Sequence, residues 1–497
     1  DDARALLAAL AAAPAHALAL PAVAGEAVAG AAAALADVTD ADARARADVL
    51  LTAAFVAHGR TLLVGRLSPR RVVEAWHIDP RAEDVDSALA RAFRAADVRA
   101  GIDALAPRHA GYAALRAALA RYRTIVARGG WPTIGVARTL RPGDPLPTGA
   151  RLATRLAAEG LLDTSAAVAA RADSVRMRAP APRYDGALAG AVARFQAAHG
   201  IAPDSVLGPA TRVALDVPAT RRLAEIAANL ERYRWLPSAF GRRYVLVDIP
   251  AFRLTAYDAG RRVLDMPVVV GDEVDERRTP ILADTMTRVE FGPYWNVPPG
   301  IAADEVVPKG RRDRGWFERE GYEAVRGWGD DPPVVDLSQA TPAALASERV
   351  RIRQRPGPTN ALGRVKFLFP NAHHVYLHDT PAKSLFDARV RAASHGCVRV
   401  GDPAALARFV LAAEDGWTPA RIDAALARGE PEGVDLARRL PVYLVYLTVD
   451  APDGALVFRP DRYRRDDPLI EALGALPDGA EARAALDALA ARLAPGG

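Results

Sequence analysis

The sequence predicts an α+β protein of several domains, with a helical N-terminal half and a mainly antiparallel β domain after it. The chain has 497 residues, which is too long for a single hydrophobic core. Residues 1–128 are rich in Ala, Leu and Arg and poor in strand formers, so helices should dominate there. From Tyr244 onward, short runs of Val, Leu, Ile and Tyr alternate with Pro or Gly turns, which indicates strands.

The composition excludes several classes of protein. Hydrophobic residues make up 50% of the chain and charged residues 25%, which is ordinary for a globular protein. Lys and Arg number 65 against 60 Asp and Glu, and they form no basic block, so we expect no nucleic-acid partner. No uninterrupted apolar run reaches about 18 residues, so no transmembrane span is predicted. The acidic start, Asp1-Asp2, is unlike a signal peptide, and we expect a chain whose leader has already been removed.

The first predicted domain, residues 1–149, is a helical scaffold. An amphipathic helix is expected from Asp40 to His58, ending at Gly59. A second helix should run from Ala113 to Arg128, where a Gly-Gly pair follows. The Pro- and Gly-rich stretch 141–145 indicates a linker.

A small helical module is predicted over residues 150–217. Within its helix at Ala187–His199, residues Leu188, Val192 and Phe195 fall on one face. Residues 218–241 then form a connector, because Thr220 to Trp235 has the apolar stripe of a single amphipathic helix.

The third large domain is predicted at residues 242–450, followed by a C-terminal extension at 451–497 with a helix near Glu481–Leu493. Between Pro299 and about Pro356 the strand pattern lapses, which indicates a subdomain inserted into the β domain. The expected strands are Tyr244–Ile249, Phe252–Tyr257, Val263–Val270, Thr285–Phe291, Val375–His378 and Pro441–Val449. Asp402-Pro403 has the N-cap and first-turn proline of a helix that should run to Asp415.

Cys397 is the only cysteine of the chain and follows a His-Gly pair. The thiolate is the attacking form of cysteine, so a nucleophilic Cys397 needs a nearby base, for which His378 and His395 are the candidates. The alternative is that Cys397 is a small buried hydrophobic residue, as many free cysteines are. Ser394 to Cys397 should form a turn whose backbone N–H groups point at one spot and bind an oxyanion. Arg399 could lower the pKa of the thiol or bind a carboxylate, or it could form an ordinary surface salt bridge.

A zinc site is the main rival for this histidine-rich region. His374 and His378 have a spacing that binds zinc from a helix, but the segment has strand character. On a strand the two residues lie about 13 Å apart, whereas zinc needs its nitrogen ligands at about 2 Å. We therefore predict no metal site here.

The string Ser394–Arg399, with His378 nineteen positions before Cys397, resembles the signature of L,D-transpeptidases, the cysteine enzymes that cross-link peptidoglycan. The strings 294–298, 376–381 and 441–443 are similar to the large periplasmic branch of that family. Residues 151–215 resemble a peptidoglycan-binding module, with Asp185-Gly186, Phe195-Gln196, His199-Gly200 and 207–211 in the matching places. The segment 299–356 resembles the capping subdomain of this branch.

The resemblance implies a role for each matching residue. Cys397 would be the nucleophile and His378 the general base and acid, while His395 and Gly396 would shape the turn and the oxyanion site. The residues implied to line the substrate groove are Tyr376, Arg399, Trp295, Asn296 and Ser394. The third partner of the triad is often a backbone carbonyl in this family, so no side chain is assigned to it; Asp379 should point to the opposite face of the strand.

The resemblance further implies a periplasmic, monomeric enzyme without a cofactor that makes 3-3 cross-links between peptidoglycan stem peptides, and a target of carbapenems. Cys397 would release D-alanine from a tetrapeptide stem, leaving a thioester that the amine of a second stem attacks. Two alternatives stay open: an L,D-carboxypeptidase that passes the acyl group to water, and an inactive wall-binding scaffold. The binding module could also be a spacer without a ligand groove, and Trp316 and Trp328 are expected to anchor the core of the insertion.

Overall fold

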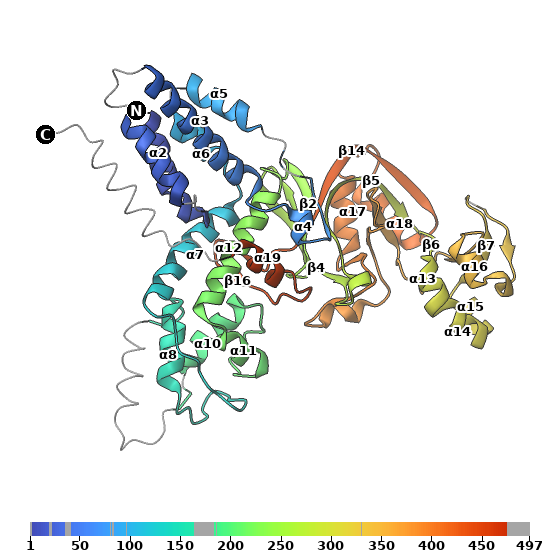
Figure 1. The fold of residues 1–497 in the computed structure, drawn as a ribbon. Helices are drawn as coiled ribbons and strands as arrows, with labels where there is room; N and C mark the ends of the chain where they lie inside the picture. Colours follow the sequence, from blue (N-terminus) through green and yellow to red (C-terminus); the bar gives the residue numbers. More distant parts are fainter. Residues whose placement is uncertain are drawn as a thin grey trace. The chain divides into compact units, whose positions relative to one another are not determined.

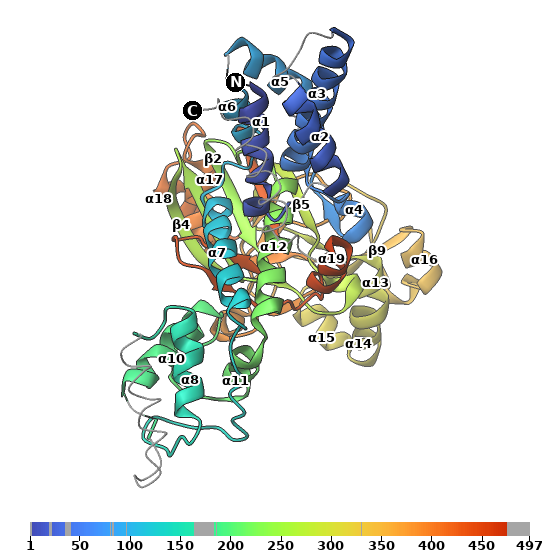
Figure 2. The same ribbon diagram turned by 60° about the vertical axis from the view of Figure 1, so that its left-hand side comes forward.

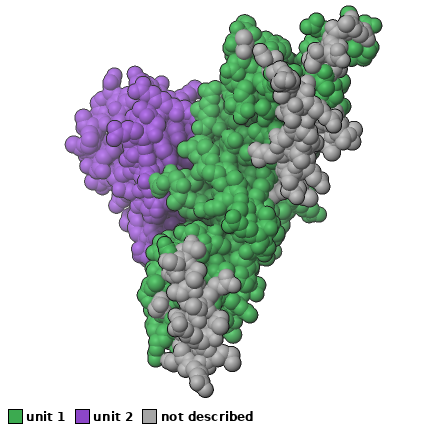
Figure 3. All heavy atoms as spheres, turned by 90° about the vertical axis from the view of Figure 1, so that its left-hand side faces the viewer, with its two compact units in different colours: residues 1–239, 447–497 green, residues 240–446 purple. Residues whose placement is uncertain are grey.

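The chain forms two compact units in the computed structural model, which describes residues 2–18, 22–34, 41–79, 81, 84–95, 97–163, 183–184, 186–329 and 331–474 (Figure 1). Residues 1–239 and 447–497 make up unit 1, and residues 240–446 make up unit 2 (Figure 3). The chain therefore leaves unit 1, completes unit 2, and returns to unit 1. The predicted helix at Glu481–Leu493 lies outside the described residues.

Unit 1 is helical, as predicted, and begins with a bundle around one apolar core. This core gathers residues such as Leu10, Phe55, Leu62 and Ile102. The helices are α1 (Asp2–Ala11), α2 (Ala22–Ala34), α3 (Ala41–Val64), α4 (Pro69–Val72), α5 (Val85–Arg94), α6 (Val98–Asp103) and α7 (Ala110–Ala127).

Helix α3 does not end at Gly59, so that prediction was wrong. The helix continues to Val64, and a Cβ atom at position 59 would lie 2.7 Å from Cδ1 of Leu105. The glycine therefore serves close packing rather than helix termination. Among the described residues, α3 is also the one helix long and apolar enough to cross a membrane, with 44% of its apolar window buried. A core helix of this kind passes the same test, so the finding is weak evidence for a span.

The second half of unit 1 contains the helices predicted for the small module and the connector. Here α8 (Gly149–Ala158), α10 (Gly186–Ala198) and α11 (Pro209–Asp216) share a core that includes Leu188, Val192 and Phe195. The connector helix α12 (Ala219–Trp235) lies beside α7 in both views (Figures 1 and 2). The returning chain adds β15 (Val449–Asp450), β16 (Val457–Phe458) and α19 (Asp466–Leu473) to this unit.

Unit 2 is built on a mainly antiparallel sheet that closes on itself. Its hydrogen-bonded order is β5-β10-β11-β13-β4-β3-β2-β14, and β14 pairs again with β5. The strands are β2 (Arg243–Asp248), β3 (Arg253–Asp258), β4 (Arg261–Gly271), β5 (Ile281–Phe291), β10 (Val365–Leu368), β11 (Leu377–His378), β13 (Val398–Val400) and β14 (Glu432–Val445), with β12 (Ala392–Ser394) beside β4. The predicted strand at Pro441–Val449 overlaps the end of a longer strand, β14, which begins at Glu432 and ends at Val445, four residues before the predicted end.

Helices α17 (Pro403–Leu411) and α18 (Pro419–Arg428) precede β14. The predicted cap of α17 is confirmed, because a carboxylate oxygen of Asp402 accepts from the N–H of Ala405 at 2.9 Å and Pro403 is in the first turn. The helix ends at Leu411, four residues before the predicted end at Asp415.

The segment at 299–356 folds, together with residues 295–298 before it, as a small subdomain with its own core, and we call residues 295–356 the cap. Its apolar core includes Val306, Phe317, Leu337 and Ile352. The strand pattern lapses in the sequence of this segment, but the folded cap does contain strands. It contains a four-stranded sheet in the order β6-β9-β7-β8. The elements are β6 (Trp295–Asn296), α13 (Pro299–Ile301), a π-helical turn η3 (Ala302–Val306), α14 (Val307–Arg312), α15 (Arg314–Arg319), β7 (Tyr322–Arg326), β8 (Val334–Val335), α16 (Pro342–Ala346) and β9 (Val350–Gln354).

Candidate active site

The strand register of unit 2 brings the two predicted catalytic segments together. Strands β11 and β13 run parallel, with His378 opposite Arg399, and the N–H of Val398 donates to the carbonyl of Tyr376 at 3.1 Å. Because side chains alternate along a strand, Tyr376 and His378 share one face, and Cys397 and Arg399 lie on that same face across the ladder. His378 at the end of β11 and Cys397, directly before β13, thus face the same side of the sheet.

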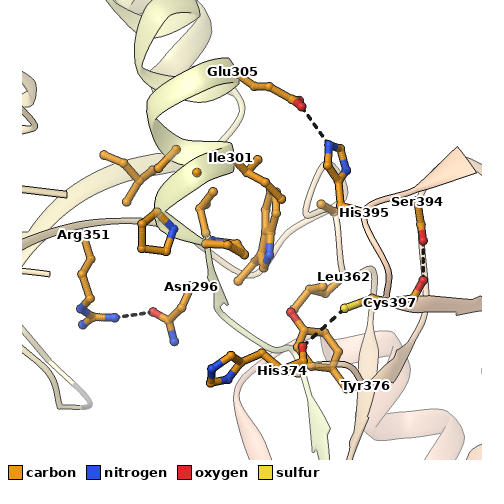
Figure 4. A pocket seen from close by; sticks show the side chains of 18 of the residues that line it. Asn296, Ile301, Glu305, Arg351, Leu362, His374, Tyr376, Ser394, His395 and Cys397 are labelled. Carbon is orange, nitrogen blue, oxygen red and sulfur yellow. Dashed lines mark hydrogen bonds and ion pairs between the residues drawn. The ribbon is translucent and has the colours of Figure 1, made fainter. Parts of the chain in front are cut away.

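Eight of the nine predicted site residues line a single pocket of about 820 Å³. Cys397 and Tyr376 line it from the sheet side, and Asn296, Ile301 and Arg351 of the cap lie on the other side (Figure 4). His378 and Trp295 also line the pocket, and the exception is Gly396. The site is therefore enclosed between the closed sheet and the inserted subdomain.

The thiol of Cys397 is held in its protonated form. Burial raises its pKa to about 11, although a backbone hydrogen bond from Tyr376 and the charge of Arg399 act in the opposite direction. The Sγ–H group donates to the carbonyl of His374 at 3.7 Å (Figure 4). The resting site thus holds a neutral thiol that becomes reactive only when a base removes its proton.

The imidazole of His378 is buried and held in one orientation. It is 4% exposed, and its Nδ1 lies 2.5 Å from the backbone carbonyl of Asp379. Since a carbonyl can only accept, Nδ1 carries the proton and Nε2 keeps its lone pair. Burial, and then the charge of Arg399, lower the pKa of His378 to about 3, so the ring is neutral and able to accept a proton.

The third partner of the histidine is therefore a backbone carbonyl and not the Asp379 carboxylate. That carboxylate accepts from the N–H groups of Arg364 and Thr380 at 2.8 and 2.7 Å, and Lys383 lies 2.5 Å from it. It fixes the segment around His378 instead of contacting the imidazole.

The turn before Cys397 is fastened by hydroxyl groups. Ser394 Oγ donates to the carbonyl of Cys397 at 2.6 Å and accepts from the N–H of Gly396 at 3.2 Å (Figure 4). Gly396 has φ +110°, a conformation that side-chain-bearing residues rarely adopt. Its carbonyl accepts from Thr279 Oγ1 at 2.8 Å.

These bonds bear on two expectations from the sequence. The N–H of Gly396 donates to Ser394 Oγ in the resting turn, and its part in an oxyanion site stays a prediction. Ser394 is 3% exposed and its hydroxyl is used within the turn, although the residue lines the pocket. Its place in the substrate groove also stays a prediction.

His395 faces the cap and not the thiol. Its Nε2 lies 2.9 Å from a carboxylate oxygen of Glu305 in η3, and the imidazole points away from Cys397 (Figure 4). The guanidinium of Arg277 lies 3.8 Å from the same carboxylate. Of the two histidines considered as the base, His395 contacts Glu305 of the cap and His378 contacts the carbonyl of Asp379; the role of His378 as base stays a prediction.

Tyr376 and Arg399 flank the thiol. Burial and the nearby Cys397 raise the pKa of the Tyr376 hydroxyl, while hydrogen bonding by the side chain of Trp295 lowers it. The ring of Tyr376 packs edge-on against His378, with 5.8 Å between ring centroids. Arg399 forms no surface salt bridge within the described residues, and its Nε is buried without a hydrogen-bond partner. This leaves an uncompensated cation beside the thiol.

Sequence reasoning missed four residues of this site: Thr279, Glu305, Trp328 and Arg351. Trp328 was expected in the core of the insertion, but its indole is 66% exposed and lines the pocket. Trp316 does pack against the core of the cap, as expected. The one signal in the sequence for its exposure is the glycine on either side of it, Gly327 and Gly329, and both adopt positive φ.

Within the described residues, no group of three or more His, Cys, Asp or Glu side chains is arranged to hold a metal ion. His374 lies before the strand that holds His378, and its backbone is left-handed with φ +53°. The two histidines therefore do not form the chelating pair that their spacing suggests on a helix.

The fold and the site define a cysteine-centred β domain with an inserted cap. Residues 242–423 match the family model YkuD, the L,D-transpeptidase catalytic domain, and residues 1–119 match the model of a scaffold domain. Residues 242–423 are therefore similar to the L,D-transpeptidase catalytic domain.

A relative from Haemophilus influenzae, named "Putative L,D-transpeptidase", is 33% identical over 248 residues. These cover 49% of this chain and 48% of the relative, so the chain spans about half the length of that protein. A solved L,D-transpeptidase from Xylanimonas cellulosilytica (its residues 123 to 326) matches 62% of this chain and 98% of its own, with 17% identity and a TM-score of 0.17. At that TM-score the solved structure adds nothing to the family assignment.

Proposed function

We propose that this protein is a periplasmic L,D-transpeptidase that forms 3-3 cross-links in peptidoglycan through a thioester on Cys397. The observation that carries the proposal is the shared sheet face, on which Cys397 and His378 lie on neighbouring strands and open into one capped pocket. The fixed tautomer of His378, with Nε2 unprotonated, supplies the base that such a thiol needs.

In the first step, Nε2 of His378 takes the thiol proton while Sγ of Cys397 attacks the carbonyl between the diamino acid and the terminal D-alanine of a stem peptide. The oxyanion of the tetrahedral intermediate accepts from the N–H of Cys397. The C–N bond then breaks, His378 gives its proton to the departing amine, and D-alanine leaves. A thioester between Cys397 and the stem remains.

In the second step, the side-chain amine of another stem attacks the thioester. His378 accepts a proton from this amine, the C–S bond breaks, and the proton returns to the thiolate. The new amide is the cross-link, and the enzyme is restored. The cap supports this reaction, because a covered pocket limits the access of water that would otherwise hydrolyse the thioester.

The charges of the resting site fit this sequence. A thiol with a pKa of about 11 and an imidazole with a pKa of about 3 stay neutral together, so proton transfer occurs only when a substrate stabilises the charges that form. Arg399, beside the thiol and without an acidic partner, would stabilise the developing thiolate or a substrate carboxylate.

The remaining roles are proposals of the same kind. Tyr376, Trp295 and Asn296 line the donor groove, and residues 150–217 bind the wall as a peptidoglycan-binding module. The domain boundaries at 149, 217, 241 and 450 stay predictions. The scheme uses no metal or organic cofactor.

The test is product analysis with the full chain and a purified tetrapeptide stem. We expect mass spectrometry to show a Cys397 thioester, released D-alanine and a dimer joined through two diamino acids, and all three should vanish in Cys397→Ala. A tripeptide without dimer would instead identify the L,D-carboxypeptidase. The absence of both thioester and carbapenem adduct in the intact protein would identify an inactive scaffold.

A further inference from the structure

One arginine lines the pocket on the cap side, opposite the cysteine. Arg351 belongs to β9 and is only 7% exposed, yet it faces the same cavity as Cys397 and His378. Figure 4 shows it on the cap wall together with Asn296. The other arginines of the pocket are Arg399 on the sheet and Arg277, and Arg277 lies within 4 Å of the carboxylates of Asp272 and Glu305.

The guanidinium of Arg351 is held in place by neutral oxygens alone. Its Nε and Nη2 donate to the carbonyl of Gly327 at 3.0 and 2.5 Å, and its Nη1 donates to Oδ1 of Asn296 at 2.8 Å. A guanidinium has five N–H donors. These bonds use three of them, so two remain for a further acceptor.

No carboxylate of the described residues lies within salt-bridge distance of Arg351. Its strand neighbour on the same face, Arg353, is by contrast paired with Glu323. Burial, followed by the charge of Arg353, lowers the pKa of Arg351, while the charge of Glu348 acts in the opposite direction. A cation kept from water without a carboxylate as hydrogen-bond partner is unfavourable, and an anion that binds in the pocket would reduce that cost.

Trp328 restricts this cation further. The guanidinium carbon of Arg351 lies 3.7 Å from the centroid of the indole ring. The tryptophan stands between Gly327 and Gly329, which adopt positive φ values of +76° and +132°, and it is 66% exposed. An indole stacked on a guanidinium fixes the plane of the cation and shields one of its faces from water.

We propose that Arg351, held by Asn296 and Trp328, is a carboxylate-binding subsite for a peptidoglycan stem peptide. The planar guanidinium matches a carboxylate through paired hydrogen bonds, which an ammonium group would not reproduce. The subsite rests on the proposed function and deepens it, because it gives the cap a part in recognition. The carboxylate belongs either to the donor or to the acceptor stem.

The first experiment separates these two sources in the full chain. Formation of the thioester is measured against donor concentration, and cross-linking against acceptor concentration, for the wild type, Arg351→Gln and Arg351→Lys. We expect Arg351→Gln to raise KM about 10- to 100-fold for one of the two stems, as loss of a charge-assisted hydrogen bond does. Arg351→Lys should restore little of this, because it lacks the planar pair of donors.

A matched control is available in the same unit. Arg421 stacks on Trp417 at 4.1 Å but pairs with Glu432 and does not line the pocket. Arg421→Gln therefore removes a tryptophan-stacked arginine without touching the proposed subsite. Equal kinetics of Arg351→Gln and Arg421→Gln toward both stems would overturn the subsite.

The second experiment needs no turnover. Calorimetry on Cys397→Ala compares a stem peptide carrying free carboxylates with the same peptide converted to carboxamides. The carboxylate form should bind at least about fivefold more tightly. Adding Arg351→Gln to Cys397→Ala should reduce this preference. Adding Arg399→Gln instead should leave the part of the preference that is due to Arg351 intact. An unchanged preference for the carboxylate form after Arg351→Gln would refute the subsite. If the wild type is inactive but the stem peptide still binds through Arg351, only the proposed transpeptidase function is refuted.

Discussion

A carboxylate oxygen of Glu305 lies 2.9 Å from Nε2 of His395, so a residue of the cap is joined to the turn that carries the nucleophile. Both side chains are about one third exposed, at 37% and 34%. A polar contact so accessible to water contributes at most about 1 kcal/mol to stability. Its importance is therefore geometric, because it ties η3 of the cap to the residue two positions before Cys397.

Replacing Glu305 by Gln should loosen the cap with little effect on folding. We expect the melting temperature to fall by less than about 4 °C, while the share of thioester lost to water rises several-fold. Mass spectrometry of tripeptide against dimer measures that ratio. Asp304→Asn is the control, since Asp304 also lines the pocket but makes no contact with His395. Equal ratios in the two variants would show that the pair does not keep the cap closed.

The reactivity of Cys397 should rise with pH far beyond the range of an ordinary thiol. Because burial raises the pKa of this thiol to about 11, alkylation by iodoacetamide should increase about tenfold per pH unit up to about pH 10, without the plateau that a thiol of pKa 8.5 shows. Arg399→Gln should slow the reaction at about pH 9, since Arg399 favours the thiolate. A plateau below about pH 7 would instead reveal a resting thiolate-imidazolium pair.

Unit 1 should lose stability in mild acid. Burial lowers the pKa values of His16 and His199 to about 3 and that of His58 to about 4. The unfolded chain binds protons at these groups below about pH 6.5, and the folded chain does not until about pH 4 or lower. The free energy of unfolding should therefore fall as the pH drops, by about 1 kcal/mol per pH unit and histidine.

Urea unfolding followed by helical circular dichroism at about pH 7 and about pH 5 measures this loss. His58→Gln should weaken the dependence on pH, and His373→Gln, at an exposed position, should leave it unchanged. A midpoint that does not move between the two pH values would contradict the prediction.

Gly396→Ala should abolish transfer while leaving Cys397 in the chain. The left-handed φ of +110° at this position is strained for alanine and should cost about 1–3 kcal/mol. Relief of that strain would displace the turn that Ser394 and Thr279 hold. Gly454→Ala introduces a comparable strain at φ +80° in unit 1, where the added carbon meets no atom within 4 Å. It should lose stability but keep activity, and equal activity losses would point to general destabilisation.

Much of this site was accessible from the sequence because its signals are local. The Ser-His-Gly-Cys string predicts a turn, and the strand character around His378 predicts which side chains share its face. The contributions of Arg351 and Glu305 of the cap could not be predicted from the sequence, because charged residues are usually exposed and their segments gave no sign that they line a pocket. In β9, Val350 and Ile352 alternate with two arginines, and only the partners supplied by Gly327, Asn296 and Glu323 make those arginines compatible with a buried strand.

The helices were predicted well where caps or periodicity decide them, as in α10, α12 and α17. The error at Gly59 has a different origin, since the close approach of Leu105 is a contact across 46 positions (105 minus 59) that no local pattern contains. The same reason explains the missed Thr279, whose hydroxyl reaches a carbonyl in a distant loop.

The return of the chain to unit 1 after β14 has a consequence for biosynthesis. Arg232 in α12 is buried and bonds to Asp466 at 2.6 Å and to Thr448 at 3.0 Å, both of which follow the whole of unit 2 in the sequence. During synthesis on the ribosome, Arg232 can form these hydrogen bonds only after more than two hundred further residues have been made. The part of unit 1 around α12 can thus finish folding only after the chain of the catalytic domain has been made, and a protein truncated before Thr448 would keep an unneutralised arginine where its interior should close.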